Sequence, residues 1–469
     1  MLIAILAGGP HVSPGQMTVV GAAALRGDRF VTRSGKWVSV LGIQAPHIED
    51  DGTVVSRLGR VSRRRLQALV EGKTLRLGFD PADPLRDGKE LAAHVYLPSG
   101  RLLSEVMLEE GFAWPDLISG TSAYERKLVG AFMRARTLQL GVHAGRKPHP
   151  RPNGTGLHRG VSMGIYSRDP EFDYAPLLDR AKNLHASHLL LITPWFMKDW
   201  ESAEIEAVAG RTAPWKTTAR VARQARDRGL RVTLMPIVLL RTGTKDHWRG
   251  DIAPRSRLKW WRNYAELMGR YADIAESAGA AMLSVGSEFS SMEKDTDRWR
   301  TLIRNLRLRF GGDLTYSANW DHFGKVTFWD ALDRAGMTGY HSLTQRDDPD
   351  LKELVAAWTG IKERVLNFQK VIKRPVFFTE VGYASVDGIN KDPWNYYISK
   401  KVDKEEQAAC FRAFIQAWRK APAGYGGAYF YNLWRNSDKD DHRNYSFLEK
   451  PAEQVIATYY RSLEEASEK

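Results

Sequence analysis

The stretches Val376-Phe-Phe-Thr-Glu-Val-Gly-Tyr383 and Ala281-Met-Leu-Ser-Val-Gly-Ser-Glu288 are apolar runs of strand length, each carrying a glutamate at or near its C-terminal end. Both are apolar almost throughout rather than at every second position, which is typical of strands in a parallel sheet covered on both faces. They therefore predict two buried parallel strands that deliver Glu288 and Glu380 to the same edge of a sheet.

Six further runs of this kind complete a set of eight: Gly160–Ser167, Ser187–Trp195, Leu230–Leu240, Leu314–Trp320, Met337–Ser342 and Gly427–Trp434. Segments with helical spacing alternate with them: Phe172–Leu184, Thr217–Arg228, Trp260–Ala278, Asp297–Phe310, Phe328–Ala335, Leu351–Ile372, Lys404–Arg419 and Ala452–Glu465. Strict alternation of strand and helix predicts the α/β class and a (β/α)8 TIM barrel. Functional side chains of this fold lie at the C-terminal strand ends, where the fourth and seventh strands face each other across the barrel mouth.

Two carboxyl groups at facing strand ends suit hydrolysis of a glycosidic bond with retention of configuration. One carboxyl protonates the leaving oxygen and the other, ionised, attacks the anomeric carbon. The charge of Glu380 would favour the protonated form of Glu288. Because the sequence has no HExxH, no paired cysteines at zinc spacing and no Walker-type loop, we expect no cofactor and no metal.

The arrangement resembles clan A of the glycoside hydrolases, and residues 160–460 resemble glycoside hydrolase family 113, whose described members act on β-mannan. The resemblance implies that Glu288 is the general acid/base and Glu380 the nucleophile. Much of the clan has Asn before the acid, which binds the sugar 2-hydroxyl; here Ser287 stands there and can still donate a hydrogen bond. We therefore expect a retaining hydrolase of β-mannan-like or bacterial surface or exopolysaccharide. The sugar, its linkage and endo or exo cutting stay open.

Other residues at strand ends are candidates for sugar binding. The resemblance implies that the ring of Trp434 stacks on the sugar being cleaved and that Tyr340 bonds the nucleophile. The remaining candidates follow the second, fifth and sixth strands: Trp195, Asn319, Trp320 and His341. Aromatic faces suit the apolar C–H patches of sugars, although such rings also pack barrel tops. Trp200, Trp248 and Trp394 lie in predicted loops.

Residues 1–145 are predicted to form a separate domain. Its strand-like runs are Met17–Ala24, Phe30–Thr32, Trp37–Leu41, Thr74–Phe79 and Leu91–Tyr96, followed by helical patterns at Leu103–Gly111 and Tyr124–Thr137. This order suits a small five-stranded, OB-type β-barrel. A junction rich in Pro and Gly at residues 146–156 separates it from the TIM-barrel domain, residues 157–469.

This first domain resembles the staphylococcal nuclease fold in four segments: Gly27-Asp28, Val40–Pro46, Gly72–Asp80 and Leu102–Trp114. That family binds calcium with aspartates and a glutamate and holds phosphate with two arginines. Asp28 matches one aspartate, but the other positions hold Gln44, His47, Ser39 and Lys89. Loss of a charged ligand and of both arginine forks implies a domain without nuclease activity, in which Asp28 is a turn residue.

The chain is basic, with 69 Lys+Arg against 55 Asp+Glu and a formal net charge of +14. Residues 1–150 hold 20 basic and 14 acidic residues, a net of +6, which leaves +8 for the remainder. Shared basicity disfavours a dedicated nucleic-acid arm and favours encounter with polysaccharides, including anionic ones. The cluster Arg60, Arg63, Arg64 and Arg65 fits a solvated helix face or a surface that meets phosphate or acidic polysaccharide.

No apolar run approaches the roughly 18 residues of a membrane helix. The start, Met1–Gly9, is apolar without a basic region, so we expect a signal peptide to be absent or truncated. Long polysaccharides lie outside the cytoplasm, which favours a periplasmic or secreted location. Two alternative functions stay open: non-catalytic glycan binding, and nucleic-acid binding through the first domain. The oligomeric state is not predicted.

Overall fold

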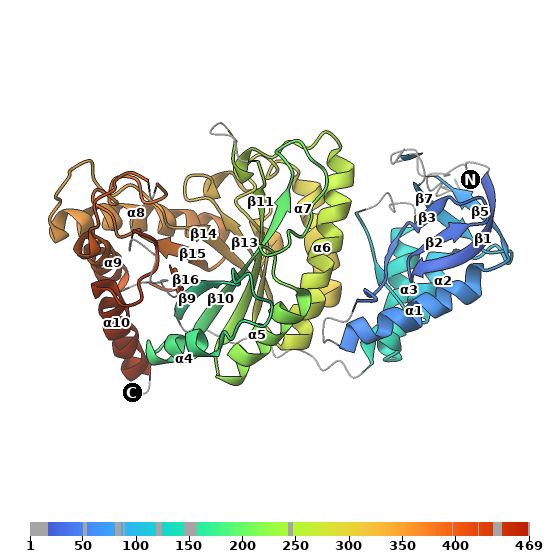
Figure 1. Ribbon diagram of the computed structural model, residues 1–469, viewed down its shortest axis with the longest axis horizontal. Helices are drawn as coiled ribbons and strands as arrows, with labels where there is room; N and C mark the ends of the chain where they lie inside the picture. The colour runs from blue at the N-terminus through green and yellow to red at the C-terminus, as the bar shows by residue number, and fades with distance from the viewer. Residues whose placement is uncertain are drawn as a thin grey trace, which may run out of the picture. The chain divides into compact units, whose positions relative to one another are not determined.

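The computed structural model describes residues 17–49, 54–79, 86–87, 90–118, 124–144, 157–242, 247–395, 397–420, 422–434 and 443–467 (Figure 1). The chain divides into two compact units. The first contains residues 1–149, 254–277 and 304–311, and the second contains residues 150–253, 278–303 and 312–469. The predicted junction, the apolar start and Lys89 lie outside the described residues.

The first unit contains the predicted five-stranded barrel. Its strands are β1 (Met17–Arg26), β2 (Arg29–Thr32), β3 (Trp37–Val40), β5 (Thr74–Gly78) and β7 (Glu90–Tyr96). The order β3-β2-β1-β5-β7 closes because β3 also pairs with β7. Three short strands are added: β4 (Ile43–Gln44), β6 (Arg86–Asp87) and β8 (Trp114–Pro115). Alternation decides the core, since Leu75 and Leu77 are buried between exposed neighbours.

Helices pack against this barrel: α1 (Val54–Val70), α2 (Leu103–Glu109), α3 (Glu125–Thr137) and the 3₁₀ turn η1 (Gly141–His143). Helix α1 is amphipathic, with Leu66 and Leu69 buried in the core. The basic cluster lies on its other face, where Arg60, Arg63 and Arg64 are exposed. Arg65 forms a bidentate pair with Glu110.

The second unit contains the predicted eight-stranded parallel barrel, which closes through pairing of the last strand with the first. Its strands are β9 (His158–Gly164), β10 (His188–Met197), β11 (Arg231–Leu240), β12 (Met282–Ser287), β13 (Asp313–Ala318), β14 (Arg334–Thr338), β15 (Val376–Gly382) and β16 (Tyr425–Tyr431). Apolar side chains from several strands, Leu190, Met235 and Phe377 among them, form a cluster in this barrel. His158 and His188 stack there at 4.0 Å between ring centroids, and burial lowers the pKa of His188 to about 3.

Helices follow the strands in sequence, and α4, α5, α8, α9 and α10 lie outside the ring of strands (Figure 1). The helices and 3₁₀ turns are α4 (Ala175–Asn183), α5 (Trp215–Asp227), η2 (Arg249–Asp251), α6 (Arg257–Ala278), α7 (Thr296–Arg309), η3 (Phe323–Lys325), η4 (Trp329–Ala331), α8 (Leu351–Ile372), α9 (Lys404–Trp418) and α10 (Pro451–Ser467). Helix α8 has the predicted bounds because Asp350 and Glu353 form a capping box. In the part of the chain described, every helix is too short or too polar to span a bilayer.

The prediction was wrong before the sixth strand. Residues Phe328–Ala335 contain the short turn η4 instead of a helix, and β14 begins at Arg334 rather than at Met337. Asp333 explains the difference: its backbone N–H donates to Leu314 O, and its carboxylate accepts from Leu314 N at 2.7 Å. These two bonds draw the chain into the sheet early, so Tyr340 and His341 follow the strand instead of lying within it.

Candidate active site

Glu288 follows the last residue of β12 and is 4% exposed. Its backbone is left-handed, with φ of 54°, a conformation that costs a non-glycine residue about 1–2 kcal/mol. Its N–H donates to Ser317 O at 2.8 Å, which fixes the residue to the neighbouring strand β13. Strain held in place by a sheet hydrogen bond is characteristic of functional positions.

Glu380 lies within β15, 6% exposed, and its Oε2 accepts a hydrogen bond of 2.7 Å from the Tyr340 hydroxyl. Thr338 connects the two glutamates: it is the sheet partner of Glu380, and its hydroxyl donates to Glu288 Oε1 at 3.1 Å. The structure thus brings the two predicted carboxyl groups together at the C-terminal ends of β12 and β15.

Arg249 is a third charged group at this place. It lies in η2, after β11, and its Nη2 donates to Glu288 Oε2. The η2 segment is fastened to the chain after Glu288, because Ser291 N donates to Gly250 O at 2.9 Å and Ser291 Oγ donates to Ile252 O at 2.6 Å. The hydrogen bonds of Ser291 therefore hold the guanidinium beside Glu288.

The electrostatics differ from the sequence-based expectation. Burial, and then the charge of Glu288, raise the pKa of Glu380 to about 7, against the lowering effects of Arg249 and Tyr340. We expected the proton to be favoured on Glu288. Arg249 forms an ion pair with Glu288, and its charge lowers the pKa of Glu380 less than burial and Glu288 together raise it.

Trp434 follows β16 and is partly exposed. It lies in an aromatic group with Phe172, stacked at 6.0 Å between centroids, Tyr166 at 5.9 Å and Tyr174 at 6.3 Å. Tyr166 lies near Glu380, since burial, Tyr431 and the charge of Glu380 together raise its pKa well above the ordinary value. Tyr166 therefore lies between Trp434 and Glu380, and it connects the aromatic group to this glutamate.

Trp320 lies beside the other glutamate. Its backbone N–H donates to Thr338 Oγ1 at 3.1 Å, the hydroxyl that donates to Glu288. Its ring stacks on Trp394 at 5.3 Å, and Trp394 is 45% exposed. This pair makes an aromatic face on the Glu288 side of the site.

The remaining predicted residues have different surroundings. Ser287 is fully buried, and its Oγ has no hydrogen-bond partner among the described residues. The Asn319 side chain accepts from Trp320 N at 3.0 Å and orders the loop. His341 is buried between Trp320 and Trp358, and burial lowers its pKa to about 3. Trp195 is buried and packs on Trp215 at 4.8 Å.

Three residues were missed. Thr338 was assigned to the start of the wrongly placed sixth strand, Arg249 lies in a loop without a motif, and Tyr166 follows β9 without one. A correct register for β14 would have put Thr338 at a strand end, where polar residues deserve scrutiny. No signal in the sequence distinguishes Arg249 from the other basic residues.

Among the described residues, Asp387, Asp403 and Glu406 come close enough to share an ion. Their oxygens already bind the protein: Lys401 pairs with Asp387 at 3.0 Å, and Asp403 accepts from Glu406 N at 2.8 Å. Glu406 accepts from Gly388 N and Asn390 N. These hydrogen bonds and the ion pair stabilise the loop that contains the three acidic residues.

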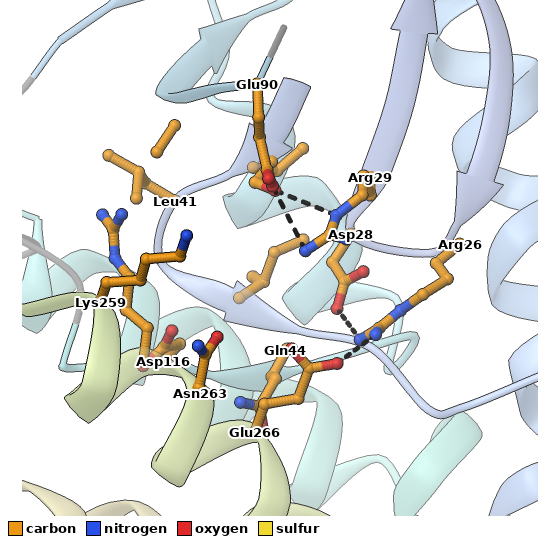
Figure 2. A pocket seen from close by; sticks show the side chains of 15 residues that line it. Arg26, Asp28, Arg29, Leu41, Gln44, Glu90, Asp116, Lys259, Asn263 and Glu266 are labelled. Carbon is orange, nitrogen blue, oxygen red and sulfur yellow. Dashed lines mark hydrogen bonds and ion pairs between the residues drawn. The ribbon is translucent and has the colours of Figure 1, made fainter. Parts of the chain in front are cut away.

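A pocket of about 210 Å³ in the first unit is lined by Asp28, Ser39 and Gln44, three of the positions compared with the nuclease family (Figure 2). Asp28 accepts hydrogen bonds from Ala45 N at 2.7 Å and from Arg26 at 3.0 Å. Arg29 faces Glu90, and Ser39 Oγ donates to Glu90 at 2.7 Å. Asp28 and Glu90 are thus both paired with arginines of this pocket.

The chain was compared with known proteins. The model of Glycoside Hydrolase Family 113 matches residues 173–450, more than half of the chain. A solved complex of a GH113 β-1,4-mannanase is 24% identical, covering 65% of this chain and 99% of that one, with a TM-score of 0.58. The GH113 β-mannanase AaManA from Alicyclobacillus acidocaldarius, in complex with ManMIm, is 25% identical over 66% and 98%, with a TM-score of 0.58. No curated protein sequence matches. The chain is a glycoside hydrolase and belongs to glycoside hydrolase family 113.

Proposed function

We propose that the chain hydrolyses a β-linked, mannan-type polysaccharide with retention of configuration, using Glu380 as nucleophile and Glu288 as acid/base. The observation that carries this proposal is the meeting of both carboxyl groups around Thr338. The mannan-type substrate is favoured by the two structural neighbours, which are named β-mannanases.

The reaction has two steps. In the first, a Glu380 oxygen attacks the anomeric carbon while the bond to the leaving oxygen breaks and Glu288 transfers its proton to that oxygen. In the second, Glu288 takes a proton from water, the water oxygen attacks the anomeric carbon, and Glu380 leaves as a carboxylate. The Tyr340 hydroxyl, 2.7 Å from Glu380 Oε2, orients the nucleophile and stabilises it when ionised.

Two sets of aromatic rings would contact the two sugars that the cleaved bond joins. The acid faces the leaving sugar, so the Trp320–Trp394 pair on the Glu288 side would support that sugar. Trp434, linked to Glu380 through Tyr166, would support the sugar that is attacked.

The test measures new reducing ends from β-1,4-mannan oligosaccharides with the wild type, Glu288→Gln and Glu380→Gln. Each variant is expected to lose at least about 100-fold in kcat, because it removes a group that transfers a proton or forms a bond. Glu105→Gln, at a buried glutamate of the first unit, is the control and should keep full activity. Proton NMR of the first product should show the β anomer. Unchanged hydrolysis in either site variant, or an α product, would overturn the assignment.

For the first domain we infer a nuclease-like barrel without nuclease activity. Two observations support the inference. The carboxylate of Asp28 already accepts hydrogen bonds from Ala45 N and Arg26. Ser39 and Lys89 stand where the nuclease family has its two phosphate-binding arginines. Incubation of the purified protein with single- and double-stranded DNA and calcium should give no cleavage. Calcium-dependent cleavage that Asp28→Asn abolishes would refute the inference.

A further inference from the structure

Arg249 has no part in the two steps above, although it is the cation that touches the acid. Its side chain is 18% exposed and pairs with Glu288; burial lowers the pKa of Arg249, but the charges of Glu288 and Glu380 raise it above the ordinary value. The backbone contacts of Ser291 hold its segment in this position. A role in the site, rather than a surface ion pair, follows from this placement.

The ion pair creates a problem for catalysis. Glu288 must carry a proton when the glycosidic bond breaks, yet in the free enzyme its Oε2 accepts a hydrogen bond from the Arg249 guanidinium. If Glu288 is simply protonated, the guanidinium loses its nearest counter-charge in a buried place, which is costly. A substrate group that pairs with Arg249 would remove both difficulties together.

Resting on the proposed function, we propose that Arg249 binds a carboxylate of the substrate, so that the preferred polymer is a β-1,4-linked mannan-type chain whose sugars are oxidised to uronates. A guanidinium offers five N–H donors in a fork that matches a carboxylate. The Nε donor of Arg249 is buried and has no partner among the described residues, so the fork has capacity beyond its bond to Glu288.

In this complex the substrate carboxylate replaces Glu288 as the counter-ion of Arg249. Glu288 is then released to hold the proton it must donate, and Glu380 keeps the hydrogen bond from Tyr340. A neutral sugar offers only hydroxyl groups, which accept from a guanidinium without cancelling its charge. The net charge of +14 favours encounter with such an anionic polymer.

The test compares β-1,4-mannohexaose with the hexamer of β-1,4-mannuronate, because reduction of the C6 carboxylates converts the second into the first. Wild-type kcat/KM should be at least about 100-fold higher on the uronate, because mannohexaose has no carboxylate to pair with the Arg249 guanidinium. Arg249→Gln should abolish this preference. Arg249→Lys keeps the charge without the fork and should restore part of it.

Binding gives a readout separate from hydrolysis. Calorimetry with Glu380→Gln should show tighter binding of the uronate hexamer than of mannohexaose, and Arg249→Gln in that background should remove the difference. Equal or better use of mannohexaose by the wild type overturns the role of Arg249 while leaving the hydrolase assignment standing. Absence of hydrolysis of both hexamers by the wild type would instead overturn the proposed function.

Discussion

Tyr340→Phe removes the hydroxyl that donates to Glu380 Oε2 at 2.7 Å and leaves the ring in place. A hydrogen bond to a charged group is worth about 1.5–3 kcal/mol, and one pKa unit corresponds to about 1.4 kcal/mol. Burial already raises the pKa of Glu380 to about 7, so its value in the variant should be about 1–2 units higher. Burial also keeps the pKa of Tyr340 well above its ordinary value, so the wild-type phenol remains a donor throughout.

The sign follows from the role of Glu380, which attacks only when ionised. The acid limb of kcat/KM should lie near pH 7 in the wild type and move upward in Tyr340→Phe. At pH 7 the ionised fraction falls from about one half to about 1–10%, a loss of roughly 5- to 50-fold that shrinks as the pH rises. The assay is reducing-end release from pH 5 to 10.

Tyr383→Phe is the matched control. It removes a buried tyrosine hydroxyl just after the same strand, one that accepts from Trp358 Nε1 at 2.9 Å. Its acid limb should coincide with that of the wild type. An acid limb that stays in place or moves downward in Tyr340→Phe refutes the electrostatic reasoning, as does an equal shift in Tyr383→Phe.

Thr338→Val should lower kcat/KM on oligosaccharides about tenfold or more, because the hydrogen bond to Glu288 is lost, yet spare dinitrophenyl glycosides, whose leaving group needs no proton; equal losses on both substrates would contradict this. Trp394→Ala should raise KM several-fold for long oligosaccharides and leave short aryl glycosides unaffected, since it removes the ring stacked on Trp320. His188, held neutral with a pKa of about 3, should make the unfolding free energy fall as the pH drops below about 6.5, by up to about 1.4 kcal/mol per unit. Urea unfolding of His188→Gln between pH 4 and 7 should show a shallower slope than the wild type, and an identical slope would count against the burial argument.

Most of the fold could be predicted because buried parallel strands leave an uninterrupted apolar signal. Leu190, Phe377 and Tyr429 belong to such strands, and their side chains fill the barrel interior. Apolar runs of this length, alternating with helical segments, are typical of buried parallel strands. The segment after Phe328 misled because Phe328, Trp329 and Leu332 have helical spacing, although they are buried around a short turn. Two hydrogen bonds of Asp333 outweigh that spacing, and propensity cannot reveal them.

The candidate site was predicted where position alone determines function. Glu288 and Glu380 could be placed because strand ends of a barrel converge. Arg249 could not, because the path of a loop depends on contacts such as those of Ser291 with Gly250 and Ile252. The ion pair between Arg249 and Glu288 depends on the path of this loop, so the sequence alone could not predict it.

The left-handed backbone of Glu288 has a consequence for how this barrel can change over evolution. Glycine adopts a φ of 54° without steric cost and asparagine tolerates it well, so replacing the glutamate with either relieves the backbone while deleting the acid. The same replacement takes the paired carboxylate away from the buried Arg249 guanidinium, which is costly, so the backbone gain and the electrostatic loss oppose each other. A change at this codon alone would convert the hydrolase into a sugar-binding barrel whose aromatic rings are still in place, and a second change at Arg249 would remove the unpaired charge.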